Sequence, residues 1–523
     1  MWTLTRALHV LKVEFFFKSH HAFDRRTYLL GIFCLLFALG TTRGVSGDAA
    51  RRLVITQQIL AYGRVHVPDP QEGLVQTPDG WTVPSPIGQV LLFIPFEAAG
   101  KILSFSGVPG ARAIPLTYFY CPVVGAAFCL ALLAMLEAFG LSSAEAAAAS
   151  LILTFCSLAL FYVAHSYQEE IPAAVLVCLS LRAVLLWRRL RRRRYAFQSG
   201  LFGASILLFR YNGVFALIPL AVVFAGGLQK IGLKAIRAPV TAGLLGTLGP
   251  ASVYATFAYL RFGNPLLTGY EGLHPDWEAQ VPPDAGLAFY FSTGMNLLFG
   301  IGKGLFIFSP VFIVALWALW TRRSTLARYG IGCLAALLGG ILLALRILPA
   351  AVDGCWSWGP RYQVHLLPLL AYPAWIGVKD LVARRLQIVV IATLGFGFFA
   401  HLCGMAAFQT LEYRQLLPQS DPVGVCRAVQ TNQFAMRLRN ISRALGFAED
   451  PKTTDETLRR EFNPFWGFRN ARRFSGWIRD CMTLAWLGFF VLAPICLHSA
   501  FAPRPPYLGR RSRTCSLLGR TGV

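Results

Sequence analysis

Long apolar runs recur along the whole chain, separated by short polar or basic stretches. Most approach the roughly 20 residues that an α-helix needs to cross the hydrocarbon core of a bilayer. The pattern predicts an all-α polytopic membrane protein with about 12 transmembrane helices. We expect the spans at 28–43, 113–137, 143–163, 171–188, 198–210, 213–228, 239–260, 304–320, 329–348, 362–377, 386–406 and 478–498.

Two segments near the N-terminus resemble spans but are better interpreted as interfacial helices. Residues 48–63 are amphipathic, with Arg51 and Arg52 expected to face water. Residues 86–104 contain Glu97 and Lys101 and are flanked by Pro84 and Pro86. If 86–104 crossed the membrane, every later loop would change sides. We therefore expect both helices to lie along the outer surface of the membrane.

Composition agrees with the membrane assignment. The 523 residues are 55% hydrophobic and only 14% charged, and the mean hydropathy is +0.53. Soluble proteins carry about 25% charged residues. Among the twelve cysteines no CxxC or Cys/His spacing occurs, so neither a zinc site nor a disulfide framework is indicated.

The net charge of +24 comes from 49 basic against 25 acidic residues. The basic residues form blocks on alternate loops, as the positive-inside rule requires of cytoplasmic connections. A nucleic-acid surface would gather them on one soluble face, so nucleic acid is excluded as a partner. The blocks lie at 188–194, 230–237, 322–328, 379–385 and 504–513.

This topology divides the chain into five parts. Basic residues precede the first apolar run and no cleavage site is clear, so the N-terminus is expected to be cytoplasmic and uncleaved. Outer loops are expected at 44–112, 261–303 and 407–477. The predicted parts are the cytoplasmic N-terminus 1–27, the transmembrane module 28–406, the outer loop 407–477, the last helix 478–498 and the cytoplasmic basic tail 499–523.

Candidate catalytic residues lie where predicted spans meet the outer face. Asp48 opens the first surface helix, where the helix dipole favours an ionised carboxylate that can accept a proton. The alternative for Asp48 is an ordinary N-cap. Glu169 and Glu170 begin another span, where adjacent carboxylates are costly unless they are used. Their alternative role is compensation of the dipole before Pro172.

Cationic and aromatic residues expected at the same face are candidates for binding an anionic substrate. Arginine suits phosphate because it forms bidentate contacts. The alternative for each cation is snorkelling to the interface. The candidate substrate-binding residues are Arg51, Arg210, Lys303, Arg361 and Tyr362.

Several short motifs resemble the GT-C superfamily of membrane glycosyltransferases. The likeness is greatest to the bacterial lipid-carrier-dependent branch related to protein mannosyltransferases and the aminoarabinose transferase of lipid A. It covers roughly residues 28–378. The motifs are Ser46-Gly47-Asp48, Pro84-Ser85-Pro86-Ile87-Gly88, Tyr167-Gln168-Glu169-Glu170, Tyr259-Leu260-Arg261-Phe262-Gly263-Asn264-Pro265, Gly302-Lys303-Gly304 and Trp358-Gly359-Pro360-Arg361-Tyr362.

The resemblance implies transfer of a hexose or pentose from a polyprenyl-phosphate carrier, in a bacterial inner membrane with the active site on the periplasmic face. Asp48 takes the place of the general base or metal-contacting acid, and Glu169 or Glu170 that of the second acid. Relatives often carry paired acids where Asp48 is followed by Ala49. A divalent metal is a possible cofactor that the sequence does not indicate, since a single carboxylate is a poor site for a hard cation.

The competing hypothesis is a transporter or flippase of a lipid-linked or anionic substrate. Transporters place ionisable groups at mid-membrane in broken helices. Arg210, followed by Asn212 and Gly213, is the one stretch that fits. The other acids and bases gather at the predicted outer face, which favours the enzyme.

Overall fold

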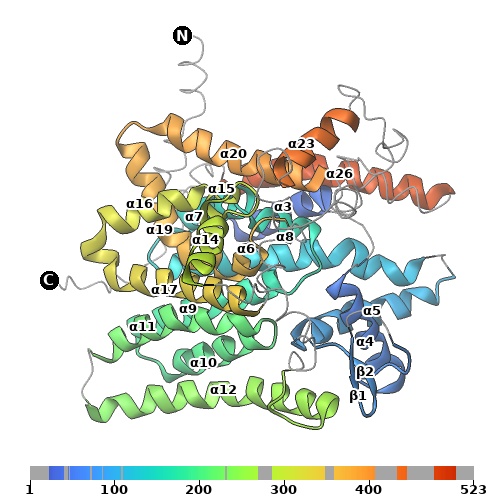
Figure 1. Ribbon diagram of the computed structural model, residues 1–523. Coiled ribbons are helices and arrows are strands. Elements are labelled where there is room, and N and C mark those ends of the chain that lie inside the picture. The colour runs from blue at the N-terminus through green and yellow to red at the C-terminus, as the bar shows by residue number, and fades with distance from the viewer. Residues whose placement is uncertain are drawn as a thin grey trace, which may run out of the picture.

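Helices make up nearly all of the ordered elements in the computed structural model (Figure 1). It describes residues 23–40, 45, 47–70, 74–84, 86–107, 110–229, 233–268, 286–347, 358–406, 433–444 and 476–501. The expectation of an all-α protein is confirmed for this part of the chain, where the only strands are the short β1 (Val75–Thr77) and β2 (Gly80–Thr82). They pair antiparallel, with Gln76 opposite Trp81.

Within the described residues, a helix or two consecutive helices lie in each of the twelve predicted spans. Six helices among the described residues are long and apolar enough to cross a bilayer, so the total of about 12 spans stays a prediction. The helices in these ranges are α3 (Arg25–Leu39), α6 (Tyr120–Ala138), α7 (Ser143–Phe155), α8 (Ala159–His165), α9 (Glu170–Leu190), α10 (Arg193–Leu207), α11 (Leu217–Leu228), α12 (Leu233–Phe262), α15 (Leu305–Phe308), α16 (Val311–Thr321), α17 (Arg323–Ile347), α19 (Leu367–Ala383), α20 (Gln387–Ala406) and α26 (Gly476–Phe501).

Further helices lie in the predicted outer loops. In the first loop, α4 (Asp48–Tyr62) and α5 (Gly88–Ser104) form side by side, with the β1–β2 hairpin between them in sequence. Sequence analysis missed α14 (Leu287–Phe299) and α23 (Gln433–Ala444), which lie in the second and third loops. Short turns of helix occur at η1 (Ala111–Ala113), η2 (Pro115–Phe119), η3 (Tyr211–Ala216) and η4 (Arg361–Leu366).

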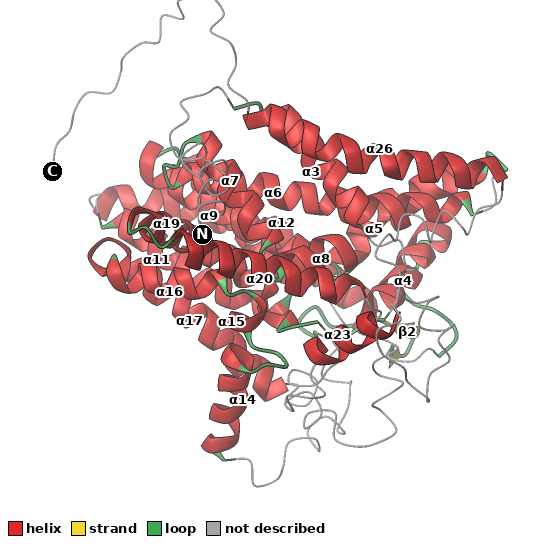
Figure 2. Cartoon of the chain, turned by 90° about the horizontal axis from the view of Figure 1, so that it is seen from above, coloured by secondary structure: helices red, strands yellow, loops and turns green. Residues whose placement is uncertain are grey.

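The two ends of the described chain lie side by side. Helix α26 runs along α3 in both views (Figures 1 and 2), and Trp486 donates a hydrogen bond to the carbonyl of Ala38 at 2.9 Å. Helices α10 and α12 also pack closely, because a Cβ on Gly200 would meet the Gly243 carbonyl at 1.9 Å. Small residues at such crossings let membrane helices approach without a hydrophobic driving force.

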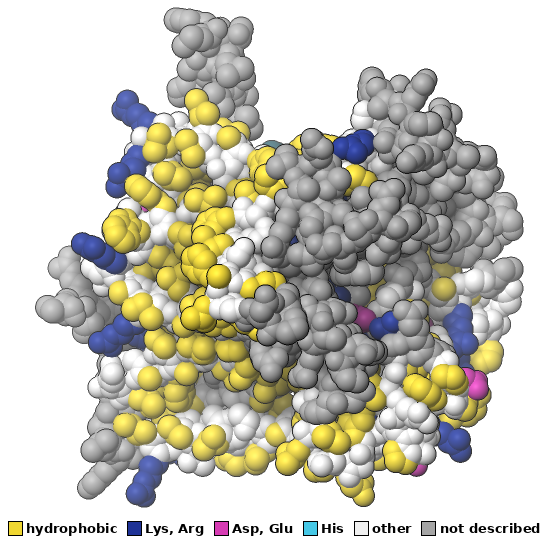
Figure 3. Space-filling view, in the orientation of Figure 1, with side chains coloured by type: hydrophobic (Ala, Val, Ile, Leu, Met, Phe, Trp, Pro, Cys, Tyr) yellow, Lys and Arg dark blue, Asp and Glu magenta, His cyan; other side chains and the backbone are white. Residues whose placement is uncertain are grey.

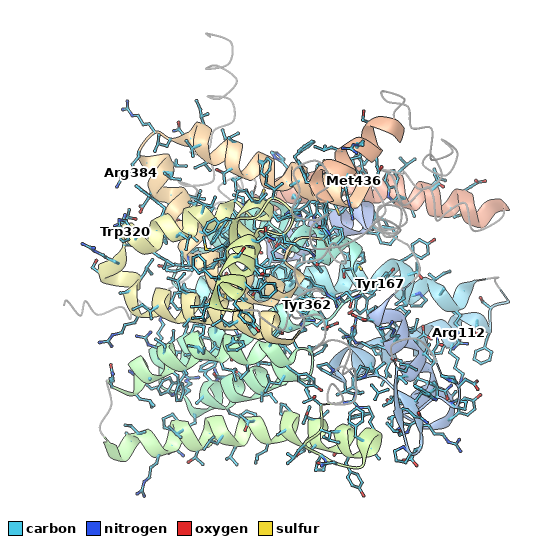
Figure 4. The ribbon with its side chains drawn as sticks, viewed as in Figure 1. Arg112, Tyr167, Trp320, Tyr362, Arg384 and Met436 are labelled. Carbon is cyan, nitrogen blue, oxygen red and sulfur yellow. The ribbon has the colours of Figure 1, made fainter. Side chains whose placement is uncertain are left out.

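Three of the basic blocks lie next to one another. Arg191 donates to the carbonyl of Gly227 at 2.9 Å, Arg328 donates to Gln229 at 2.9 Å, and Arg322 pairs with Asp380 at 2.7 Å. Trp320 and Arg384 lie at the same edge of the molecule in Figure 4. Figure 3 shows basic side chains along that edge and hydrophobic side chains over much of the face beside it. These three blocks therefore share one side of the molecule, as the predicted topology requires of them.

Candidate active site

A cluster of charged side chains lies at the opposite ends of the helices that carry the basic blocks. Four chain segments supply its acids and bases at places where a helix begins, and one of them contributes Arg210, which precedes η3. Asp48 is the first residue of α4, Glu169 and Glu170 begin α9, and Arg361 begins η4. Figure 4 shows Tyr167 and Tyr362, the sequence neighbours of these groups, near the middle of the molecule. We call the set the charged cluster: Asp48, Arg51, Arg52, Glu169, Glu170, Arg210 and Arg361.

Glu169 lies at the centre of the charged cluster with 3% of its side chain exposed. Its carboxylate accepts from Arg52 and, at 2.6 Å, from Arg210, and Arg361 lies 3.6 Å away. Burial alone would raise the pKa of Glu169, but the charges of Arg52 and Arg210 outweigh it and hold the pKa well below its ordinary value. Glu169 is therefore ionised, and its charge is balanced by buried guanidinium groups. These ion pairs hold its side chain in place.

Arg361 joins the other two acids. Its guanidinium donates to Glu170 at 2.5 Å, to the side-chain oxygen of Gln168 at 2.7 Å and to Asp48 at 3.3 Å. Its side chain is 15% exposed, so it reaches the solvent-accessible edge of the charged cluster. Arg361 thus connects the buried glutamates with the most accessible carboxylate.

Asp48 is the accessible acid of the charged cluster, with 43% of its side chain exposed. It does not cap α4: Gly47 is the N-cap residue, and that cap lacks a side-chain hydrogen bond. Asp48 instead contacts Arg361 at 3.3 Å and Arg51 at 3.2 Å. Burial would raise the pKa of Asp48, but Arg361 and Arg52 lower it below its ordinary value. Asp48 is an ionised acceptor at neutral pH that solvent or a ligand can reach.

Two polar groups in the charged cluster have unused hydrogen-bonding atoms. Within the described part of the chain, Nε and Nη2 of Arg210 and Oε2 of Glu170 are buried without a hydrogen-bond partner. Burial of a charged donor without a partner is costly. Arg210 also stacks over the ring of Tyr362 at 4.9 Å, which fixes the plane of its guanidinium. Arg210 therefore has two donors for which the described residues supply no acceptor, and such donors suit an anion.

Lys303 lies beside the charged cluster rather than within it. Its ammonium is fully buried and donates to the carbonyl of Gly359 at 3.2 Å, two residues before Arg361. Tyr362 follows Arg361 directly, and its carbonyl accepts from Asn212 at 3.2 Å. The structure therefore brings six predicted residues into direct contact, and it places Lys303 and Tyr362 next to them.

Sequence reasoning missed Arg52, Gln89 and Gln168 as members of this polar network. Arg52 was expected to face water, but it is 2% exposed, because its guanidinium turns toward Glu169 and donates to Gln89 at 2.7 Å. Gln168 contacts Arg361 as described above. The spacing of Arg52 and the buried Thr56, one helical turn apart on α4, marks a polar inward face that could have identified Arg52.

The donor set does not suit a divalent cation. Each of the three carboxylates of the charged cluster pairs with at least one arginine, and the four arginines would repel a metal ion. No group of three or more His, Cys, Asp or Glu with metal-binding geometry occurs among the described residues. The charged cluster fits an anion better than a cation.

The chain was compared with protein-family models, curated proteins and solved structures. No protein-family model and no curated protein matches the chain. The chain is similar to ArnT from Cupriavidus metallidurans, whose crystal structure was determined in the apo state. The two are 16% identical, the alignment covers 90% of this chain and 75% of the other, and the TM-score is 0.44.

Proposed function

We propose that the protein is a membrane glycosyltransferase that moves a sugar from a polyprenyl-phosphate carrier to a hydroxyl group of an acceptor. The observation that supports it best is an accessible carboxylate, Asp48, in the same charged cluster as the buried Arg210, which has two unused donors. A transferase of this kind needs a base for the acceptor and cations for the departing phosphate. Three of the motifs that resemble the GT-C superfamily contain Asp48, Glu169 and Arg361 of the charged cluster. The sugar is proposed to be a hexose or pentose.

The reaction follows as a single displacement. Asp48 accepts the proton of the acceptor hydroxyl, and the acceptor oxygen attacks the anomeric carbon of the sugar. The bond from that carbon to the carrier phosphate breaks, and the phosphate leaves with the electron pair. Arg361 and Arg210 stabilise its negative charge through charge-assisted hydrogen bonds. One displacement inverts the anomeric configuration.

The protein is proposed to act in the bacterial inner membrane with the charged cluster on the periplasmic side. The basic blocks at the other side of the molecule support this orientation. The donor and the surrounding membrane lipid are then the expected partners, and the acceptor approaches Asp48 from the aqueous face.

A transporter or flippase is the second candidate. Its support is the break at Arg210, which has an extended backbone (φ −146°, ψ 121°) between α10 and η3 and a buried side chain. Interrupted helices with buried ionisable groups are typical of transport sites. Because Arg210 is bound to Glu169 at a helix start, the same break also serves to bring it to the charged cluster.

The decisive experiment uses purified protein in liposomes with a radiolabelled polyprenyl-phosphate sugar and an envelope glycan extract. The proposed enzyme releases the carrier phosphate and labels an acceptor, whereas a flippase moves the intact donor across the bilayer. We expect Arg361→Ala to weaken use of the donor by about 1.5–3 kcal/mol, the scale of a charge-assisted hydrogen bond. Donor movement without any cleavage would contradict the proposal, and equal transfer by Arg361→Ala would remove that residue from it.

A further inference from the structure

The turn that precedes Arg361 is held from several directions. Gly359 has φ +58°, a left-handed conformation that favours glycine. The backbone N–H of Arg361 donates to the Gly359 carbonyl at 3.0 Å, and Lys303 donates to the same carbonyl at 3.2 Å. The position of the Arg361 backbone therefore depends on the position of Gly359.

Helix α23 contacts this turn with two buried side chains. The side-chain oxygen of Gln433 accepts from the backbone N–H of Gly359 at 3.2 Å. The guanidinium of Arg437 stacks over the ring of Trp358 at 4.4 Å. Gln433 and Arg437 are 2% and 0% exposed. Both lie one helical turn apart, so they form one face of α23 directed at residues 358–359. Met436, labelled in Figure 4, marks this helix.

Membrane helices hold the other side of Trp358. Tyr162 of α8 donates to the Trp358 carbonyl at 3.0 Å, and the indole N–H of Trp358 donates to His401 of α20 at 3.2 Å. A Cβ on Gly404 would lie 2.4 Å from the indole, so α20 leaves no room for the ring to move that way. The turn is therefore clamped between the transmembrane module and α23.

We propose that Gln433 and Arg437 are positioning residues for Arg361, so that α23 fixes the residue that contacts the carrier phosphate. This inference rests on the proposed function. Loss of the Gln433 acceptor leaves the Gly359 N–H buried without that partner, and loss of Arg437 removes the stacked plane above Trp358. Either change lets the turn shift, and a displacement of roughly 1 Å at a catalytic group can cost on the order of 10²-fold in rate.

The test compares matched variants of α23. Gln433→Leu removes the acceptor at similar volume, and Gln433→Glu keeps it. Arg437→Leu removes the stacking guanidinium. Arg439→Gln changes an exposed arginine on the same helix and serves as the control. Each purified variant is assayed for kcat and KM with the radiolabelled polyprenyl-phosphate sugar, and its amount of folded protein is measured by thermal unfolding in detergent.

We expect both Leu variants to raise the KM for the donor and to lower kcat/KM by about 10- to 100-fold. The kcat/KM of Gln433→Glu and of the control should remain within about threefold of the wild-type value. One lost hydrogen bond would correspond to a factor of about 10. In an Arg361→Lys background, Gln433→Leu should cause little further loss, because residues that act through one group are not additive.

Four results would overturn the inference while leaving the proposed function intact: unchanged KM in both Leu variants, equal loss in Gln433→Leu and Gln433→Glu, an additive loss in the Arg361→Lys background, or loss of folded protein in both Leu variants. The last result would make the pair structural. Absence of any transfer by the wild type would instead overturn the proposed function and this inference with it.

Discussion

Asp48 is held by charge rather than by a capping bond. As the first residue of α4 it gains from the helix dipole, and Arg361 and Arg51 lie within 3.3 Å of its oxygens. A residue whose task was capping would bond the backbone N–H groups of its own helix. The contacts of Asp48 to a second chain segment support a role at the charged cluster.

Replacement of Asp48 by Asn separates the charge from the shape. Asn occupies the same space as Asp. The substitution removes the ion pairs with Arg361 and Arg51 and the ability to take a proton. We expect Asp48→Asn to fold normally and to lower transfer by on the order of 10²–10⁴-fold, the contribution of a positioned base. Expression and transfer should be measured in the same membranes. Full activity would move the role of base to Glu169 or Glu170.

The pH dependence follows from the lowered pKa of Asp48. A carboxylate with a folded pKa below its unfolded value, about 3.9, stabilises the fold above that pH and loses this contribution as the pH falls through the folded pKa. Since Glu169 is shifted the same way, both acids stay ionised through the weakly acidic range. We therefore expect kcat at saturating donor to be nearly constant from about pH 5 to pH 7. An acid limb centred within that range would contradict Asp48 as the base.

Individual site residues could be predicted from sequence when their position was unusual. Asp48, Glu169 and Arg361 were identifiable because charges at the ends of apolar runs are costly. Arg52 was not, since an arginine on an amphipathic helix has the same pattern whether it faces water or a buried acid. Its partner Glu169 lies 117 residues later in the chain, and that pairing depends on packing that no local pattern encodes.

At the scale of elements, a break between two helices brings Arg210 to the charged cluster. The short apolar segments around Arg210 predicted a break, and the structure has one between α10 and η3. The sequence could not predict that α23 would reach the turn before Arg361, because its region has few apolar residues and no span-like pattern. Where an amphipathic helix packs is determined by the surface against which it buries its apolar face, and the sequence of the helix does not identify that surface.

The turn at Gly359 provides a test at this scale. A Cβ there would meet Leu158 at 2.9 Å and Phe308 at 3.1 Å, in addition to the strain of its positive φ. Gly63 also has a positive φ, +65°, but nothing lies within 4 Å. We expect Gly63→Ala to cost roughly 1 kcal/mol, the left-handed strain alone. Gly359→Ala should cost about 1–3 kcal/mol more because of overpacking.

Thermal unfolding in detergent and donor KM check this pair. Gly359→Ala should also raise the donor KM, because the turn carries Arg361, whereas Gly63→Ala should leave it unchanged. Equal unfolding temperatures and equal KM values in the two variants would contradict this prediction. They would show that the side chains around Gly359 can rearrange without moving Arg361.

At the scale of the whole molecule, the charged cluster and the basic blocks are separated by the length of a membrane helix. Helix α9 carries Glu170 at its start and Arg188 and Arg189 in its last turn. Its 21 residues span about 30 Å at the usual rise, which matches the hydrocarbon core of a bilayer. One helix thus connects the acids of the proposed site with the first basic block.

The predicted topology can be measured directly with single cysteines. We expect a cysteine at position 70 or 285 to react with an impermeant maleimide in intact cells, and a cysteine at 192 or 325 to react only after the membrane is opened. Position 285 lies outside the described residues and tests the sequence prediction alone. All twelve native cysteines should first be replaced by Ser or Ala, because Cys481 is exposed and Cys355, Cys426 and Cys515 lie outside the described residues.

The four positions test one model because the helices link them. Arg192 is two residues after the end of α9, and Thr325 is three residues after Arg322, which contacts Asp380 near the end of α19. If 192 and 325 are both protected while 70 is labelled, α9 places Glu170 at the outer face and Asp48 beside it. Labelling of 192 in intact cells would reverse α9, bring the charged cluster to the cytoplasmic side, and exclude an acceptor that approaches from outside.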